Sequence, residues 1–307
     1  MPASSTVRVV LHPLHVPGTR EALDGVDGVE LLCPDDSDLP AALASASVLV
    51  TYRWEDHYLV SSLRWIQSLS AGVDQFPLDR LADAGVVLTS ARGVNAPAVA
   101  EHAFALLLAL TRGVGASVRR AGEWRPLLGE EIGGRTMAVV GLGAVGEEVA
   151  RRAAAWGLRV VGVKRRPDDY RGVAERVVGP DRLGDVLAEA DIAVVALPET
   201  AETRRVIDAR ALRALGRGWV INVGRGSAVD VDALLAALER DELAGVGLDV
   251  TDPEPLPADH PLWAHPRVVI TPHIAGLTPR FASRFVPLFV ANLDAFRGRG
   301  EWTNRVV

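Results

Sequence analysis

The chain has 307 residues, of which 49% are hydrophobic and 23% charged, and its formal net charge is −6. This length predicts about two domains, and the acidic balance argues against a nucleic-acid partner, because nucleic-acid-binding proteins usually carry a basic patch. A single cysteine, Cys33, excludes an internal disulfide and fits a reducing compartment. We find no signal-peptide pattern, and the longest apolar stretch, Ala103 to Leu110, is too short to span a bilayer. We therefore expect a cytoplasmic protein with no membrane partner.

The first part of the chain alternates short apolar runs with helical or turn segments, which is typical of an α/β unit. Ala71, Gly72 and Val73 follow the fourth of these runs, and small residues at a strand exit expose backbone N–H groups to an anion. An ordinary turn is the alternative interpretation. Arg53 and Trp54, after the third run, are weaker candidates for a role in ligand choice. The predicted strands are Val7 to Leu11, Val29 to Leu32, Val48 to Thr51, Trp65 to Leu69 and Val86 to Thr89.

A strongly apolar helix, Ala98 to Thr111, leads into a strand, a glycine-rich loop and a second helix. The strand is Thr136 to Val140, the helix runs from Glu147 to Trp156, and a further strand follows at Leu158 to Val163. The loop between them reads GxGxxG. Its glycines allow a tight turn, close approach of a pyrophosphate and packing of the helix on the strand, so the segment predicts a dinucleotide site. The residues expected at the phosphates are Gly141, Gly143, Ala144, Val145 and Gly146.

The end of that further strand departs from the pattern for NAD. An NAD site places an acid about 20 residues after the glycine motif, where it binds the ribose 2′-OH. Here the segment reads Lys164, Arg165, Arg166. Cations at this place suit a 2′-phosphate, so the sequence predicts a preference for NADP(H) over NAD(H). The alternative is a solvated basic turn.

Three polar segments each follow a predicted buried strand in the last third of the chain. They contain Arg225, Glu254 and His273, one reactive side chain each. The carboxyl ends of parallel strands lie at the same edge of a sheet and border one crevice, so these side chains are expected to converge. An arginine that binds a carboxylate, an imidazole that moves a proton and a carboxylate that keeps the imidazole charged suffice to reduce a 2-oxo acid. The strands are predicted at Gly218 to Val223, Ala244 to Val250 and Arg267 to Ile270, and a last helix at Pro279 to Arg297.

In this order the motifs resemble the D-isomer-specific 2-hydroxyacid dehydrogenase family, in particular its glyoxylate and hydroxypyruvate reductase-like branches. The resemblance implies two Rossmann-like or flavodoxin-like α/β domains with parallel sheets and a cleft between them. It places a discontinuous substrate-binding domain at 1–97 and 277–307, and an NAD(P)-binding Rossmann domain at 98–276. The residues that carry it are Ser70 to Asp74, Asn95 to His102, the glycine motif, Leu197 to Thr203 and the three polar segments.

The resemblance also implies a role for each matched residue. Arg225, Glu254 and His273 would be catalytic, with His273 as general acid, and the loop from Ala71 to Val73 would hold the substrate carboxylate together with Arg225 and His273. Asp249 would orient the nicotinamide amide. The expected product is a D-2-hydroxy acid, the expected assembly is a homodimer, and no metal is expected. Further residues expected at the cofactor are Leu197, Pro198, Thr203, Val223, Arg225, His273 and Gly276.

Two other classes of function stay open at this point. A nucleotide-sensing protein without catalysis can retain this fold, although the three reactive residues are all present. A dehydrogenase acting on another small anion, such as phosphite, needs a similar anion clamp. Formate dehydrogenases of the same superfamily have an amide at the position of Glu254, so that branch is disfavoured.

Overall fold

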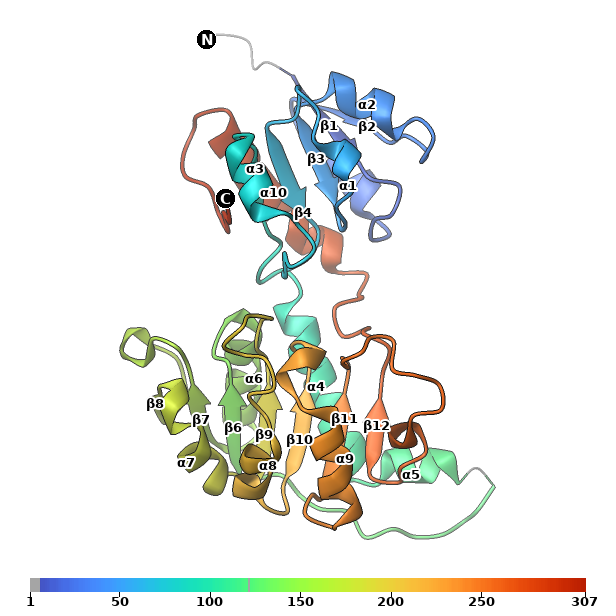
Figure 1. The fold of residues 1–307 in the computed structure, drawn as a ribbon, viewed down its shortest axis with the longest axis vertical. Helices are drawn as coiled ribbons and strands as arrows, with labels where there is room; N and C mark the ends of the chain where they lie inside the picture. The colour runs from blue at the N-terminus through green and yellow to red at the C-terminus, as the bar shows by residue number, and fades with distance from the viewer. Residues whose placement is uncertain (1–5, 121) are drawn as a thin grey trace. The chain divides into compact units, whose positions relative to one another are not determined.

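The computed structural model (Figure 1) describes residues 6–120 and 122–307. It divides into two compact units. One contains the described residues up to Asn95 together with Leu277–Val307, and the other is Ala96–Gly276. Each unit is built on a parallel sheet, which confirms the α/β class predicted from the sequence.

The first unit has a five-stranded sheet in the order β2-β1-β3-β4-β5. Its first four strands begin at the predicted residues, because each is an apolar-rich run that suits a sheet covered on both faces. The strands are β1 (Val7–Leu11), β2 (Val29–Leu32), β3 (Val48–Thr51), β4 (Trp65–Ser68) and β5 (Val87–Thr89), and the helices are α1 (Thr19–Asp24), α2 (Leu39–Ser45), α3 (Leu78–Asp83) and α10 (Phe281–Phe296).

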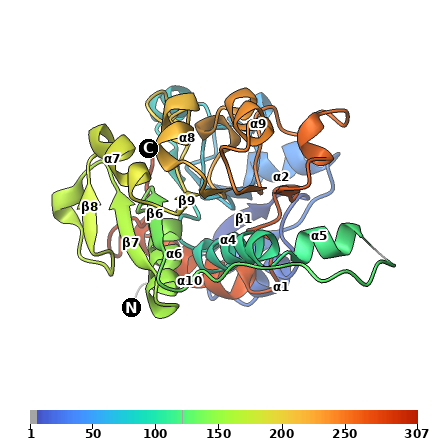
Figure 2. The same ribbon diagram turned by 90° about the horizontal axis from the view of Figure 1, so that it is seen from below.

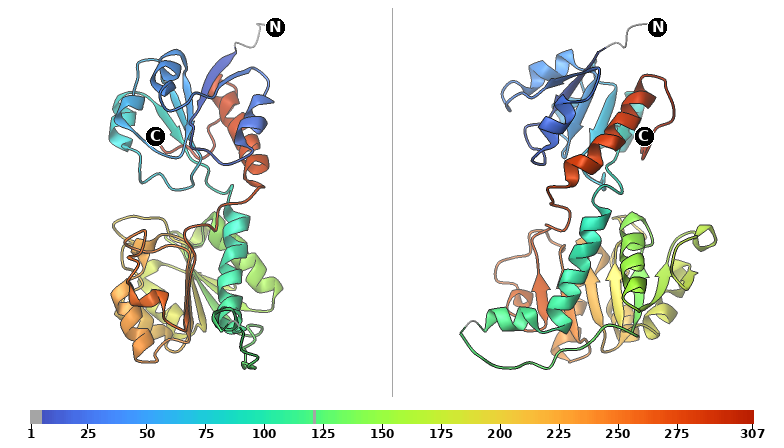
Figure 3. Two further views of the ribbon diagram at one scale, coloured as in Figure 1. Left: turned by 90° about the vertical axis from the view of Figure 1, so that its right-hand side faces the viewer. Right: turned by 180° about the vertical axis from the view of Figure 1, so that it is seen from behind.

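Helix α10 returns from the far end of the chain to complete the core of the first unit (Figure 3). Phe281, Phe285 and Phe289 recur every four residues and are fully buried. The Phe289 ring stacks on Trp65 with 5.2 Å between centroids. Asn292 adds a buried polar link, because its Nδ2 donates to Gln67 Oε1 at 2.9 Å.

The second unit has a seven-stranded sheet in the order β12-β11-β10-β9-β6-β7-β8. Helices α4 and α6 cover one face, and α7, α8 and α9 cover the other (Figure 2). The strands are β6 (Thr136–Val140), β7 (Arg159–Val163), β8 (Arg176–Val178), β9 (Ile192–Val195), β10 (Trp219–Asn222), β11 (Gly245–Leu248) and β12 (Val268–Ile270). The helices are α4 (Ala96–Thr111), α5 (Val114–Arg119), α6 (Ala144–Ala155), α7 (Leu183–Ala188), α8 (Ala209–Leu215) and α9 (Val231–Glu239).

The strand order reverses between β6 and β9. From β6 the chain adds β7 and β8 on one side, then crosses to β9 and continues to β12 on the other. Ligands of open α/β sheets bind outside the carboxyl ends of the strands at such a reversal. No helix within residues 6–120 and 122–307 combines the length and apolar character needed to cross a membrane.

Candidate active site

Six of the loops at the carboxyl edge of the seven-stranded sheet together carry every site residue predicted for this unit. The strand order therefore fixes the order of the loops along the edge. The basic turn lies at one end, the glycine loop next to it, and the loops with the three reactive residues at the other end. In this order the loops contain Lys164 to Arg166 after β7, Gly141 to Gly146 after β6, Leu197 to Thr203 after β9, Val223 to Arg225 after β10, Asp249 to Glu254 after β11 and Thr271 to Gly276 after β12.

The glycine loop is shaped for close approach of a phosphate. Helix α6 begins inside the motif, at Ala144, with Gly143 as its N-cap residue. A Cβ built on Gly146 would lie 2.0 Å from the Gly141 carbonyl oxygen, so only glycine permits this packing. The backbone N–H groups of the first turn of a helix have no partner within the helix and favour an anion. This cradle fits the pyrophosphate of a dinucleotide.

The three cations after β7 have different surroundings. The Lys164 Nζ donates to the Leu142 carbonyl at 2.9 Å, so this lysine braces the glycine loop. Arg165 and Arg166 are exposed, and the Arg166 Nε lies 3.9 Å from Asp169 Oδ2. An exposed ion pair of this length contributes little stability, so it does not compete strongly with a bound phosphate.

The loop after β9 packs against the turn that carries Arg225. The Thr203 hydroxyl donates to the Pro198 carbonyl at 2.7 Å, which closes the loop on itself. A Cβ on Gly224 would lie 2.7 Å from the backbone N and O of Leu197. The two loops are therefore in direct backbone contact at the middle of the edge.

The buried side chain of Asn222 holds the turn of Arg225. Its Nδ2 donates to the Arg225 carbonyl at 2.9 Å, and its Oδ1 accepts from the Gly224 N–H at 3.1 Å. The Arg225 Nη1 donates to the Gly224 carbonyl at 3.1 Å. Gly226 fits this turn against the β11 loop, because a Cβ there would lie 1.9 Å from the Thr251 carbonyl oxygen.

His273 and Glu254 form the pair that the sequence predicts. The His273 Nδ1 and the Glu254 Oε1 are 2.6 Å apart, which is a distance typical of a charge-assisted hydrogen bond. Both side chains are partly exposed, 49% and 42%. Since the carboxylate occupies Nδ1, the other ring nitrogen, Nε2, is the one that can exchange a proton with a ligand.

Asp249, at the start of the loop that carries Glu254, is 2% exposed. Its Oδ1 accepts from the Thr271 hydroxyl at 2.6 Å and the Ile274 N–H at 3.0 Å, and its Oδ2 accepts from the Ala275 N–H at 3.0 Å. Burial opposes ionisation, but hydrogen bonds from His102, Thr271 and the two backbone N–H groups outweigh it and lower the pKa of Asp249. Asp249 is thus a buried anion that organises the loop after β12.

His102 in this network was not predicted as a site residue. Its Nε2 lies 2.8 Å from Thr271 Oγ1 and 3.3 Å from Asp249 Oδ1. The sequence signals are its place at the end of the Asn95 to His102 motif and its polar character in the otherwise mostly apolar helix α4. A histidine in that setting is more often a packing residue.

The candidate residues of the first unit lie at the carboxyl edge of its own sheet. Ser70 to Val73 follow β4, and the Ser70 hydroxyl donates to the Gly72 carbonyl at 2.7 Å. The Gln75 Nε2 donates to the Tyr52 carbonyl at 2.6 Å and to Ser70 Oγ at 3.0 Å, which ties this loop to the segment after β3. Arg53 in that segment has its Nε 3.7 Å from Glu55 Oε1.

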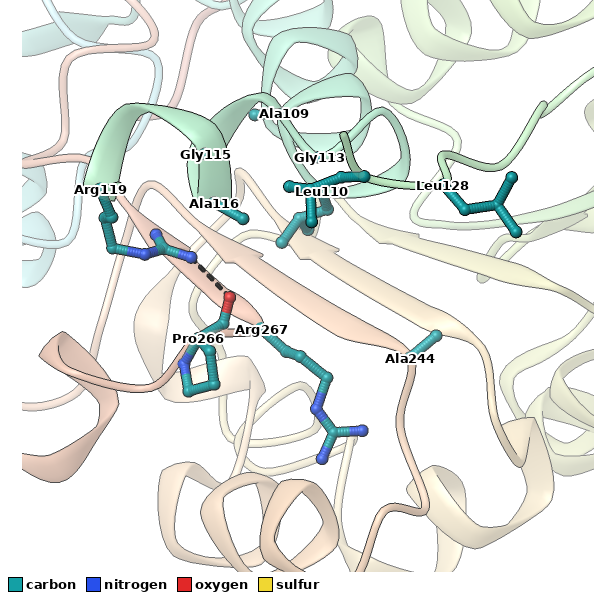
Figure 4. A pocket seen from close by; sticks show the side chains of 11 residues that line it. Ala109, Leu110, Gly113, Gly115, Ala116, Arg119, Leu128, Ala244, Pro266 and Arg267 are labelled. Atoms are coloured by element: carbon teal, nitrogen blue, oxygen red, sulfur yellow. Dashed lines mark hydrogen bonds between the residues drawn. The ribbon is translucent and has the colours of Figure 1, made fainter. Parts of the chain in front are cut away.

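A pocket of about 210 Å³ lies elsewhere, at the opposite edge of the seven-stranded sheet (Figure 4). Ala244, Pro266 and Arg267 precede β11 and β12, and helix α5 contributes Arg119, which donates to the Pro266 carbonyl. No predicted site residue lines it. Among the described residues, no group of three or more His, Cys, Asp or Glu side chains is arranged to hold a metal ion.

Comparisons with known proteins identify similar chains. Residues 104–275 match the family model described as D-isomer specific 2-hydroxyacid dehydrogenase, NAD binding domain. A glyoxylate reductase of Korarchaeum cryptofilum is 35% identical over 250 residues, covering 78% of this chain and 74% of the relative. The TT0316 protein from Thermus thermophilus is 36% identical with a TM-score of 0.81, covering 98% of this chain and 100% of that one. An NADPH-dependent glyoxylate/hydroxypyruvate reductase from Sinorhizobium meliloti, solved with NADP and malonate, is 30% identical with a TM-score of 0.81, covering 99% and 97%.

Proposed function

Because the chain belongs to the D-isomer specific 2-hydroxyacid dehydrogenase family, whose members are NAD(P)-dependent oxidoreductases, we propose that it reduces a small 2-oxo acid to the D-2-hydroxy acid with NADPH as the preferred cofactor. Glyoxylate and hydroxypyruvate are the proposed model substrates. The observation that carries the proposal is the His273–Glu254 contact of 2.6 Å on the loops of two adjacent strands, next to the strand that ends before Arg225.

In this proposal each reactive residue has one task. A reduced nicotinamide, when bound, would supply the hydride for the carbonyl carbon of the 2-oxo acid. Arg225 and the backbone N–H groups of Ala71 to Val73 bind the substrate carboxylate, and Arg225 also polarises the carbonyl. His273 donates its Nε2 proton to the oxygen as negative charge develops there. Glu254 accepts the Nδ1–H, which orients the ring and stabilises its charged form before the transfer.

The cofactor would lie along the carboxyl edge of the seven-stranded sheet. Its 2′-phosphate is assigned to Arg165 and Arg166, whose guanidinium groups match phosphate oxygens two at a time, and Lys164 supports the glycine loop. Asp249 Oδ2 accepts one N–H from the protein and has a second lone pair for the nicotinamide amide. The remaining proposed cofactor contacts are Gly141, Gly143, Ala144, Val145, Gly146, Leu197, Pro198, Thr203, Val223 and Gly276.

The test is oxidation of NADPH and of NADH with glyoxylate, hydroxypyruvate and phenylpyruvate. We expect turnover of at least one small 2-oxo acid and a higher kcat/KM with NADPH than with NADH. Nucleotide binding without turnover of any 2-oxo acid would point to a non-catalytic binding protein. Turnover of phosphite with NADP⁺ in its place would point to a different anion as substrate.

We also propose that the enzyme is a cytoplasmic homodimer. Support for self-association comes from α5 and the segment after it, where large apolar side chains are exposed: Val114 is 52% exposed, Val118 72%, Trp124 100% and Leu128 101%. Large apolar side chains exposed within one short stretch of chain are a feature of protein–protein interfaces. The segment borders the pocket of Figure 4.

A further inference from the structure

A chain of three side chains joins the first helix of the second unit to the loop that carries His273. His102 lies on α4, Asp249 follows β11 and Thr271 follows β12. The His102 Nε2 is 2.8 Å from Thr271 Oγ1, and Thr271 Oγ1 is 2.6 Å from Asp249 Oδ1. We call these three residues the His102 network.

The chemistry of the groups fixes the direction of both hydrogen bonds. An ionised carboxylate only accepts, so the single proton of the Thr271 hydroxyl goes to Asp249. The hydroxyl oxygen must then accept from His102, which therefore carries a proton on Nε2. A side chain without a donor at this place would leave the hydroxyl without its partner on α4.

Asp249, which His102 and Thr271 hold in place, in turn binds the backbone around His273. Its carboxylate accepts from the N–H groups of Ile274 and Ala275, both at 3.0 Å, and its carbonyl accepts from the His273 N–H at 2.9 Å. His273 has a φ of 54°, in the left-handed region. Such a conformation is unfavourable for a residue with a side chain, so surrounding contacts must hold it.

We propose that His102 is a positioning residue for His273, acting through Asp249, which it contacts at 3.3 Å and also reaches through the Thr271 hydroxyl. It does not touch the reacting atoms. It keeps the Asp249 carboxylate in position. That carboxylate binds the backbone N–H groups of the two residues after His273, and so Nε2 of His273 stays directed at the substrate. This inference rests on the proposed function, because it takes His273 as the proton donor.

The test compares two variants at position 102 with a neighbour on the same helix. His102→Leu introduces an apolar side chain of similar size that has no donor, whereas His102→Gln keeps an N–H near the position of Nε2. We expect kcat for glyoxylate to fall about tenfold or more in His102→Leu, because one hydrogen bond that contributes in the transition state is lost. The KM for NADPH should stay within about twofold of the wild-type value. His102→Gln should keep most of the activity. Glu101→Gln, the exposed neighbour, is the matched control and should behave as wild type.

A second readout does not depend on turnover. Hydrogen exchange of the Ile274 and Ala275 amides should be about tenfold faster in His102→Leu than in wild type or His102→Gln, because Asp249 no longer holds them as firmly. Thr271→Val removes the bridging hydroxyl but leaves the 3.3 Å contact of His102 Nε2 with Asp249 Oδ1, so it should give smaller changes in the same direction. It carries the test should His102→Leu not fold. Wild-type kcat together with wild-type exchange in the folded variants would overturn the inference. Absence of turnover in the wild-type enzyme would instead contradict the proposed function, and the exchange rates would then decide the inference alone.

Discussion

At the scale of single residues, His273 is the group on which the proposed chemistry depends. Replacing it with Ala removes the proton donor, and general acid catalysis is typically worth about 10² to 10⁴-fold in rate. We therefore expect kcat for the best 2-oxo acid to fall by that factor, while the Kd for NADPH, measured by fluorescence, stays near the wild-type value. A variant that keeps half of the wild-type kcat would rule out the assignment.

Asp249 makes a separate prediction about acid stability. Its pKa is lowered in the folded protein, so its ionised form stabilises the fold above the ordinary carboxyl pKa of 3.8, and this stabilisation is lost as the pH falls through the lower folded value. Asp249→Asn should unfold more easily in urea at pH 7, by about 1.5 to 3 kcal/mol if one charged hydrogen bond is lost. Its stability should also change less than that of wild type between pH 5 and pH 3, roughly the range over which such a carboxyl titrates. Parallel pH curves for the two proteins would contradict this role.

The sequence identifies the reactive residues but not all of their partners. Arg225, Glu254 and His273 each stand in a short motif after an apolar run, and that pattern is local. His102 and Thr271 are separated by 169 positions, so their contact depends on how α4 packs beside β12. Nothing in the sequence near Lys164 indicates that its ammonium group binds the Leu142 carbonyl rather than facing solvent.

At the scale of elements, most strands with apolar runs were predicted from the sequence, including the short edge strands β5 and β12, whereas β8 and β9 were not. The strand β8 has three residues at the edge of its sheet, begins with an exposed arginine, and offers no apolar run to recognise. Helix α4 begins at Ala96, earlier than the predicted Ala98, because Pro97 is tolerated in the first turn, where its missing N–H costs no hydrogen bond. Helix α6 likewise begins within the glycine motif rather than after it, at Ala144.

The basic turn after β7 allows a test of cofactor choice. Replacing Arg165 and Arg166 together with Ala should raise the KM for NADPH by about tenfold to ten-thousandfold, since each charged hydrogen bond to the 2′-phosphate contributes roughly 1.5 to 3 kcal/mol. The KM for NADH should change little. Lys164→Met is the contrasting variant: it releases the glycine loop, so it should weaken binding of both cofactors. If the KM for NADPH and the KM for NADH rise equally in the double variant, the two arginines have no role in cofactor choice.

At the scale of the whole molecule, the exposed apolar segment after α5 predicts the state of association. Trp124→Ser with Leu128→Ser should shift the protein from dimer to monomer in sedimentation velocity, because two fully exposed apolar side chains would lose their partner surface. Leu14→Ser, which changes an exposed leucine on the other unit, is the control and should remain a dimer. A wild-type monomer, or a dimeric double variant, would refute the assignment of this surface.

Helix α10 is synthesised last but belongs to the first unit, so the two units cannot fold in the order in which they are synthesised on the ribosome. The second unit is continuous and can fold once Gly276 has emerged, whereas the first unit, although synthesised earlier, lacks Phe281, Phe285 and Phe289 until the end of translation. The N-terminal sheet must therefore wait with one face only partly covered, by α1, while the second unit folds. A chain terminated after Gly276 should still bind NADPH, and trypsin should degrade its residues before Asn95 while sparing a core that begins near Ala96. Protection of both parts in the shortened chain would show that the early sheet does not need the helix.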